Sequence, residues 1–173
     1  MKEFANWIAA TPLSVWIQTH EAWVMPTVQS IHITAIGVVL ACVLMMALRV
    51  LGYAGADQTL VQTQQRFGPW MTGALWLLLG TGLILVVGEP VRELISFSFW
   101  AKMTLVATGV AIAFGFKRQL ARLGPDAETS LDGRGWMKVM AVVTLLIWIA
   151  VVVLGRLIAY DNVWGALSPA ARA

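Results

Sequence analysis

Four long apolar runs separated by short polar stretches dominate the pattern of the sequence. They cover about residues 28–51, 69–88, 98–116 and 137–159. Each run is about as long as the 20 or so apolar residues that a helix needs to cross a bilayer. The pattern predicts an all-α integral membrane protein, a four-transmembrane-helix bundle in which residues 1–173 form a single membrane domain.

Residues 1–25 precede the first run and follow a different pattern. After Pro12, which suits the first turn of a helix, apolar side chains recur at spacings of three and four residues. The positions with this spacing are Leu13, Trp16, Ile17, His20 and Val24. We expect an N-terminal amphipathic helix at the membrane interface, ended by Pro26, with Trp7, Trp16 and Trp23 as interfacial anchors.

The composition agrees with a membrane location. Hydrophobic residues make up 59% of the chain and charged residues 12%, which lies outside the usual range of soluble domains. The net charge of +3 is small, and the basic residues flank the apolar runs, so membrane orientation explains them better than nucleic acid does. We therefore expect the lipid bilayer as a partner and exclude nucleic acid.

The basic residues are divided unevenly between the two sides of the predicted bundle. One side collects Arg49, Arg66, Lys117, Arg118, Arg122, Arg134 and Lys138. The other side has Lys2, Arg92 and Arg172 outside the spans. Because cytoplasmic loops carry an excess of Lys and Arg, this predicts a bacterial inner-membrane protein with both termini in the periplasm. The cytoplasmic 117–136 connector has turn residues and mixed charge, so we expect it to be solvated.

Three groups that are costly in hydrocarbon occur at a similar depth near the periplasmic ends of the spans. They are His32 in the first span, Lys102 in the third and Arg156 in the fourth. Ionisable groups at membrane depth usually face the bundle interior and have a partner or a function. Ordinary roles stay open: Lys102 and Arg156 can snorkel to the boundary, and His32 can hydrogen-bond a neighbouring helix. His20, just outside the span, suits either an interfacial position or a ligand.

Other residues within the spans have simpler explanations. Arg49 ends the first span at the cytoplasmic boundary, where the excess of positive charge on that side accounts for it. Gly73, Gly80 and Gly82 in the second span are expected to be close-packing positions between helices.

The polar residues near the periplasmic side are those that a haem site in a helical bundle uses. An inward neutral histidine holds the iron through a ring nitrogen, and basic side chains in the same leaflet neutralise the propionates. We predict His32 as the haem iron ligand, with His20, Lys102 and Arg156 as further cofactor-binding residues. The second axial ligand would come from His20 or from another subunit. The sequence has no CxxCH haem-attachment motif, Walker loop or paired intramembrane carboxylates, which disfavours hydrolytic and ATP-driven functions.

Two short motifs connect the chain to known families. The segment IHITAIGVVLACVLMMALRVLG places an arginine about 17 residues after the histidine, and SFWAKMTLV opens the third span with an aromatic-x-x-Lys pattern. Over about residues 26–120 the chain resembles uncharacterised four-span bacterial membrane proteins and, more loosely, the CopD and HemJ-type membrane proteins. The HemJ-type resemblance implies haem b, with His32 as iron ligand and Lys102 and Arg49 as motif positions. The chain departs at Ala47, where the first group commonly has aspartate, and it lacks the histidine that HemJ-type chains have after the third-span lysine.

The sequence predicts a haem-b-binding or quinone-interacting inner-membrane protein that transfers electrons or forms the membrane subunit of a redox complex. A periplasmic or membrane redox subunit, or a second copy of the chain, is the expected protein partner. The alternative is a non-catalytic membrane anchor or assembly subunit, in which the 89–97 loop docks a periplasmic partner and His32 ties helices together.

Overall fold

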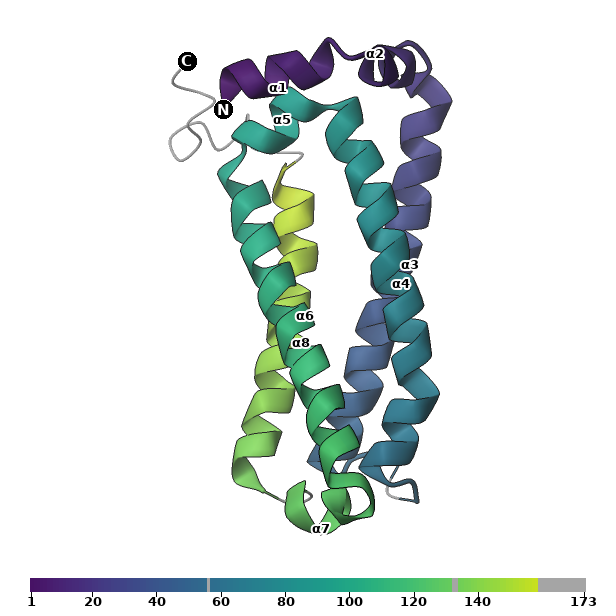
Figure 1. The fold of residues 1–173 in the computed structure, drawn as a ribbon, viewed down its shortest axis with the longest axis vertical. Coiled ribbons are helices and arrows are strands. Elements are labelled where there is room, and N and C mark those ends of the chain that lie inside the picture. The colour runs from purple at the N-terminus through teal and green to yellow at the C-terminus, as the bar shows by residue number, and fades with distance from the viewer. Residues whose placement is uncertain (56, 132–133, 159–173) are drawn as a thin grey trace.

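Four long helices form a bundle in the computed structural model, which describes residues 1–55, 57–131 and 134–158 (Figure 1). They are α3 (Glu21–Leu51), α4 (Leu60–Gly88), α6 (Phe97–Leu123) and α8 (Gly135–Leu157). Each is long and apolar enough to cross a membrane, and no strand occurs in the described ranges. The predicted fold class, a four-span helical membrane protein, is confirmed.

Short helices lie across the two ends of the bundle (Figure 1). At one end are α1 (Lys2–Ala9), α2 (Pro12–Thr19) and α5 (Pro90–Ile95), and we refer to this as the α5 end. At the other are the 3₁₀ turn η1 (Gly124–Asp126) and α7 (Ala127–Leu131), and we refer to this as the α7 end. A loop between α3 and α4 also lies at the α7 end.

The surface helix α2 begins at Pro12 as predicted but ends earlier, and α1 precedes it as a helix that was not predicted. The Thr11 hydroxyl accepts a hydrogen bond from the Ser14 amide and Pro12 occupies the first turn of α2, which is a favoured helix start. The turn into the bundle falls at His20, and α3 then continues through Pro26, so the prediction that Pro26 separates the surface helix from the first span is wrong. A proline near a helix start removes one backbone hydrogen bond, which a membrane helix tolerates.

The long helices extend beyond the apolar runs. α4 begins at Leu60, well before the predicted start at residue 69, because Thr59 and Gln62 form a reciprocal capping box there. α6 continues to Leu123, past the predicted end at residue 116. Hydropathy identifies the part of a helix that suits hydrocarbon, and the polar turns that project beyond it do not contribute to that signal.

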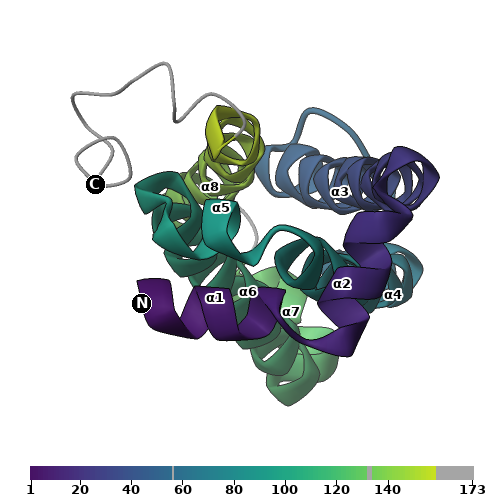
Figure 2. The same ribbon diagram turned by 90° about the horizontal axis from the view of Figure 1, so that it is seen from above.

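The long helices pack as two pairs, α3 with α4 and α6 with α8, which are joined mainly through α3 and α8 (Figure 2). The pairs approach each other more closely at the α7 end than at the α5 end (Figure 1). Midway along the bundle, Trp148 is buried in a cluster with Val39, Val43, Ala74 and Val151. This cluster separates the interior of the α5 end from that of the α7 end.

The α7 end is closed by packed side chains. Ala127 and Leu131 of α7 are buried in a cluster whose other members are Val50, Leu60, Leu120 and Met137. The prediction that the whole 117–136 connector is solvated is therefore wrong for α7, because its apolar side chains cover the ends of the long helices.

Arg49 contributes to the α7 end in a way that charge counting did not predict. Its side chain is only 6% exposed, and its Nε–H donates a hydrogen bond to the backbone carbonyl of Gln58. Gly55 lies against its aliphatic stem, where a Cβ would be 3.6 Å from Cδ. Arg49 therefore bonds the loop between α3 and α4 to the end of α3, in addition to contributing a positive charge.

Candidate functional site

His32 lies on α3 with its ring half-buried against α4. Its Nδ1 is 2.7 Å from the hydroxyl oxygen of Thr81, which is itself buried. Gly82 follows that threonine, and a Cβ there would come within 3.5 Å of the ring's Cε1, so the ring lies directly over the glycine. The imidazole is therefore fixed at the interface between α3 and α4.

The hydrogen bonds around Thr81 determine the tautomer of His32. The Thr81 hydroxyl lies 2.7 Å from the backbone carbonyl oxygen of Leu77, which can only accept, so the single hydroxyl hydrogen goes there. The Thr81 oxygen must then accept from His32, which places the imidazole proton on Nδ1. In the neutral ring the other nitrogen, Nε2, carries the free lone pair. His32 is thus oriented by Thr81 and offers Nε2 to a ligand.

Lys102 lies on α6, in the opposite helix pair, at the same end of the bundle. Its side chain is partly buried, and Nζ lies 5.7 Å from the centre of the Phe99 ring, an arrangement that favours a cation. Its stem passes Gly155 of α8, where a Cβ would be 3.7 Å from Cδ. The ammonium group is within electrostatic reach of His32, so the structure brings these two predicted site residues together.

Glu93 of α5 adds a carboxyl group beside Lys102. Burial raises the pKa of this carboxyl, while the positive charges of Lys102 and Arg92 act in the opposite direction. Arg92 lies 3.8 Å from Glu93 and also pairs with Glu89. The sequence predicts an interhelical loop here, whereas the structure has the helix α5, which brings Glu93 within electrostatic reach of Lys102.

We define the polar cluster as His32, Thr81, Glu93, Arg92 and Lys102. Its members come from four helices, α3, α4, α5 and α6, and it contains both an unprotonated ring nitrogen and cationic groups. Such an arrangement can coordinate a metal centre through one nitrogen and can neutralise an anionic group next to it.

His20, the other predicted histidine, is not part of the polar cluster. It lies at the junction of α2 and α3, where its Nδ1–H donates to the Trp16 carbonyl at 2.9 Å and its ring stacks on the Trp16 ring. It precedes His32 by about 18 Å along α3, at 1.5 Å per residue. This placement does not bring the two rings together as a pair of ligands to one iron.

Arg156 has an exposed side chain near the end of α8. It follows Gly155, the glycine that Lys102 passes, and so lies at the α5 end as predicted. Because the Arg156 side chain is exposed and that of Lys102 is partly buried, we leave Arg156 out of the polar cluster.

The glycines of α4 divide into two groups. Gly82 packs against His32, and Gly88 packs against Met25, where a Cβ would be 2.9 Å from the sulfur. For Gly73 and Gly80, a Cβ would meet no side chain of the described residues within 4 Å, so the prediction of close packing is wrong at these two positions.

The donor set fits one kind of metal centre better than others. No group of three or more His, Cys, Asp or Glu side chains gathers to hold a metal ion within the described ranges. A haem supplies four of the iron's ligands itself and needs one protein nitrogen, which matches the free Nε2 of His32.

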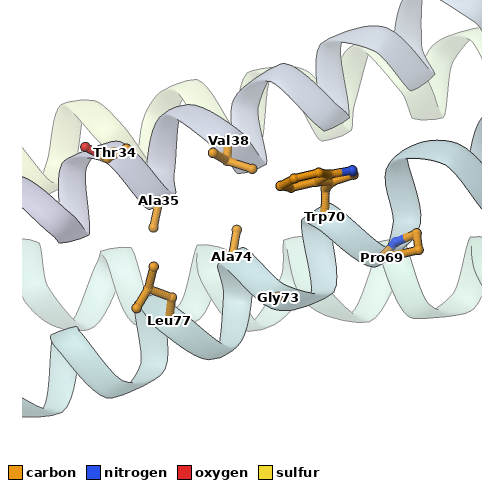
Figure 3. Close-up of a pocket in the computed structure, with 8 residues that line it drawn as sticks. All are labelled: Thr34, Ala35, Val38, Pro69, Trp70, Gly73, Ala74 and Leu77. Carbon is orange, nitrogen blue, oxygen red and sulfur yellow. The ribbon is translucent and has the colours of Figure 1, made fainter.

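A groove of about 430 Å³ lies between α3 and α4 near mid-bundle (Figure 3). Small residues open it, among them Ala35, Gly73 and Ala74, and Trp70 and Leu77 form part of its walls. None of the described residues that line the groove has a titratable side chain, so the groove suits an apolar chain.

Comparison with protein families gives one match. The profile of DUF6644, described as a family of unknown function, matches residues 4–161. Neither the curated proteins nor the solved structures yield a match to the chain.

Proposed function

The chain belongs to DUF6644, a family of unknown function, and on that premise we propose a role from the polar cluster itself: a haem-b-binding membrane protein. In this role it transfers electrons or serves as the membrane subunit of a redox complex.

The observation that carries the proposal is the hydrogen bond from His32 Nδ1–H to Thr81. Histidines that ligate metals characteristically donate their other ring N–H to a neighbouring oxygen, which fixes the ring and increases its basicity. His32 has this arrangement inside the bundle, with Nε2 free to act as the iron ligand. Lys102, on the facing helix pair, provides positive charge for a haem propionate. When bound, haem supplies one-electron redox chemistry.

The proposal uses one histidine of this chain for each haem. Because His20 is held by Trp16 at the surface, it would not hold the haem together with His32, and any further protein ligand would come from another residue or from another polypeptide.

The test is the visible spectrum of protein purified from cells supplied with haem precursor. We expect a Soret band in the wild type, its loss in His32→Ala, and its retention in His20→Ala, the matched control. Thr81→Val should weaken haem binding by roughly 10- to 100-fold, the usual effect of removing a group that orients a metal ligand. Thr72→Val is its control, because Thr72 also bonds its own helix but lies far from His32. Colourless, correctly folded wild-type protein, or full haem content in His32→Ala, would refute the haem role.

We also propose a bacterial inner-membrane location with the α5 end in the periplasm. The support is the excess of basic residues around the loops at the α7 end. Reporter fusions at Ala127 and after Ala173 should report opposite sides of the membrane, with Ala127 in the cytoplasm. A cytoplasmic C-terminal reporter would contradict this orientation.

The alternative function, a membrane anchor or assembly subunit, is supported by the surface of the α5 end. Phe4 and Trp7 of α1 are stacked on each other and are 55% and 66% exposed. Such side chains suit the lipid interface or a docked partner. Colourless protein that co-purifies stoichiometrically with a partner, and loses it when Phe4 and Trp7 are replaced by serine, would favour this alternative.

A further inference from the structure

A separate cavity of about 290 Å³ lies at the α7 end, enclosed by all four long helices. Its position is opposite the polar cluster, beyond the buried Trp148. The volume is just below the roughly 300–1,000 Å³ that sites for whole small molecules occupy. The cavity therefore has room for a ring-sized group.

The polar lining of this cavity consists of neutral groups. Gln64 of α4 and Gln119 of α6 are both half-buried, and neither side-chain amide forms a hydrogen bond with the described residues. Thr144 of α8 donates its hydroxyl hydrogen to the Met140 carbonyl, so it offers only acceptor capacity to the cavity. Half-buried amides that have no protein partner are open to hydrogen bonds with water or with the oxygen atoms of a ligand.

Gly68 makes room for the Gln64 amide. A Cβ at this position would come within 2.4 Å of Gln64 Nε2, because the glutamine side chain folds over the glycine one turn along α4. Because glycine has no side chain, the Gln64 amide can lie against this turn of α4 beside the cavity.

The remaining walls are apolar and aromatic. Phe116 and Trp136 contribute rings, and among the described residues no Asp, Glu, Lys, Arg or His lines the cavity. This lining suits a neutral ligand better than a charged one. Trp136 and Met140 are 47% and 38% exposed, so this wall borders the lipid-facing surface and a long apolar tail can leave the cavity there.

A flat neutral ring with oxygen atoms and an apolar tail meets all of these conditions. We propose that the cavity at the α7 end binds the headgroup of a membrane quinone or quinol, with the amides of Gln64 and Gln119 hydrogen-bonded to its oxygens. The side-chain NH₂ groups donate to quinone carbonyls, and the amide oxygens accept from quinol hydroxyls. The proposal extends the redox role above but does not require haem at His32, which lies at the other end.

The test measures binding of short-chain ubiquinone and menaquinone analogues to the purified chain by calorimetry in detergent. The wild type should bind at least one analogue, and an alkylbenzene with the same tail should bind at least tenfold more weakly. Gln64→Leu and Gln119→Leu should each weaken binding about three- to tenfold, the effect expected for one hydrogen bond. Gln65→Leu is the matched control, because Gln65 is an exposed neighbour of Gln64.

Two further variants keep the test decisive. Ala113→Leu fills the cavity without altering either amide and should weaken quinone binding by at least tenfold. His32→Ala should retain quinone binding, so that failure of the haem proposal and failure of this one can be distinguished. Equal binding of the quinone and the alkylbenzene, or unchanged affinity in folded Gln64→Leu/Gln119→Leu or Ala113→Leu protein, would overturn the proposal.

Discussion

The polar cluster at the α5 end contains the ionisable groups His32, Lys102 and Glu93, whereas the cavity at the α7 end is lined by the neutral amides of Gln64 and Gln119. His32 and Lys102 come from different helix pairs, at the end where the pairs diverge, and Glu93 comes from α5. The amides lie in a small cavity where the pairs converge. The difference indicates two kinds of ligand environment: one that suits a metal centre with anionic substituents, and one that suits an uncharged ring.

Trp148 stands between these two environments. On α8 it lies between Thr144, which lines the cavity, and Gly155, which Lys102 passes. Its indole is 2% exposed and rests on Gly109 of α6, where a Cβ would be 3.1 Å away. Because Gly109 has no side chain, the indole can pack directly against α6. It therefore lies between the helices near the middle of the bundle.

The largest effect is expected from Trp148→Ala, which would break the separation between the two ends. Removing a large buried side chain leaves a void and should lower the free energy of unfolding by roughly 3–5 kcal/mol. Unfolding in detergent with increasing SDS measures this loss. Trp76→Ala is the control, because Trp76 is 69% exposed, and it should change stability far less. Similar losses in the two variants would show that Trp148 does not hold the helix pairs together.

A smaller effect is expected at Arg49, which belongs to the α7 end. Arg49→Lys keeps the positive charge but removes the Nε–H that bonds the Gln58 carbonyl. A hydrogen bond from a charged group contributes roughly 1.5–3 kcal/mol, so the variant should lose an amount of that order in the same unfolding assay. Arg66→Lys, at an exposed site, serves as control. If Arg49→Lys is as stable as the wild type, the hydrogen bond to Gln58 does not contribute to stability and the positive charge is sufficient at this position.

The smallest effect concerns pH and Glu93 at the α5 end. Burial raises the pKa of this carboxyl in the folded protein, so folding favours its protonated form. Its stabilising contribution is present below about pH 4, the unfolded value, and is lost as pH rises through the folded pKa. The melting temperature of the wild type should therefore fall relative to Glu93→Gln between pH 4 and 8. Glu21→Gln, at an exposed site, should give no such difference. If the melting temperatures of the wild type and Glu93→Gln change with pH in the same way, burial does not raise the pKa of Glu93 as described.

The sequence was sufficient to predict the four spans, because long apolar runs have few other stable structures in water or lipid. It did not predict where the helices end. The capping box of Thr59 and Gln62 is a local signal that extends α4 into a polar segment, and it can be recognised in the sequence. The burial of α7 could not be recognised in the sequence, because Ala127 and Leu131 are buried only when the ends of the long helices pack around them.

The candidate site could be predicted only in part, because its residues come from different helices. His32 and Lys102 attract attention as ionisable residues within apolar runs, and the structure places them near each other. Their distance depends on how two helix pairs pack, which the linear pattern does not specify. Thr81, between two glycines, is a common kind of membrane-helix residue, and its role appears only through the bond to His32. The amides of Gln64 and Gln119 became notable only when they were found to face one cavity.

The central claim is that His32 presents the Nε2 lone pair to a haem iron. The most direct measurement is the ¹⁵N NMR spectrum of histidine-labelled, haem-free protein in detergent, before and after addition of haem. The chain has two histidines, so His20→Ala assigns both sets of signals. We predict a protonated Nδ1 and an unprotonated Nε2 for His32, and loss or displacement of the Nε2 signal when haem is added, with His20 unchanged. A proton on Nε2, or a His32 signal unaffected by haem, would contradict the account.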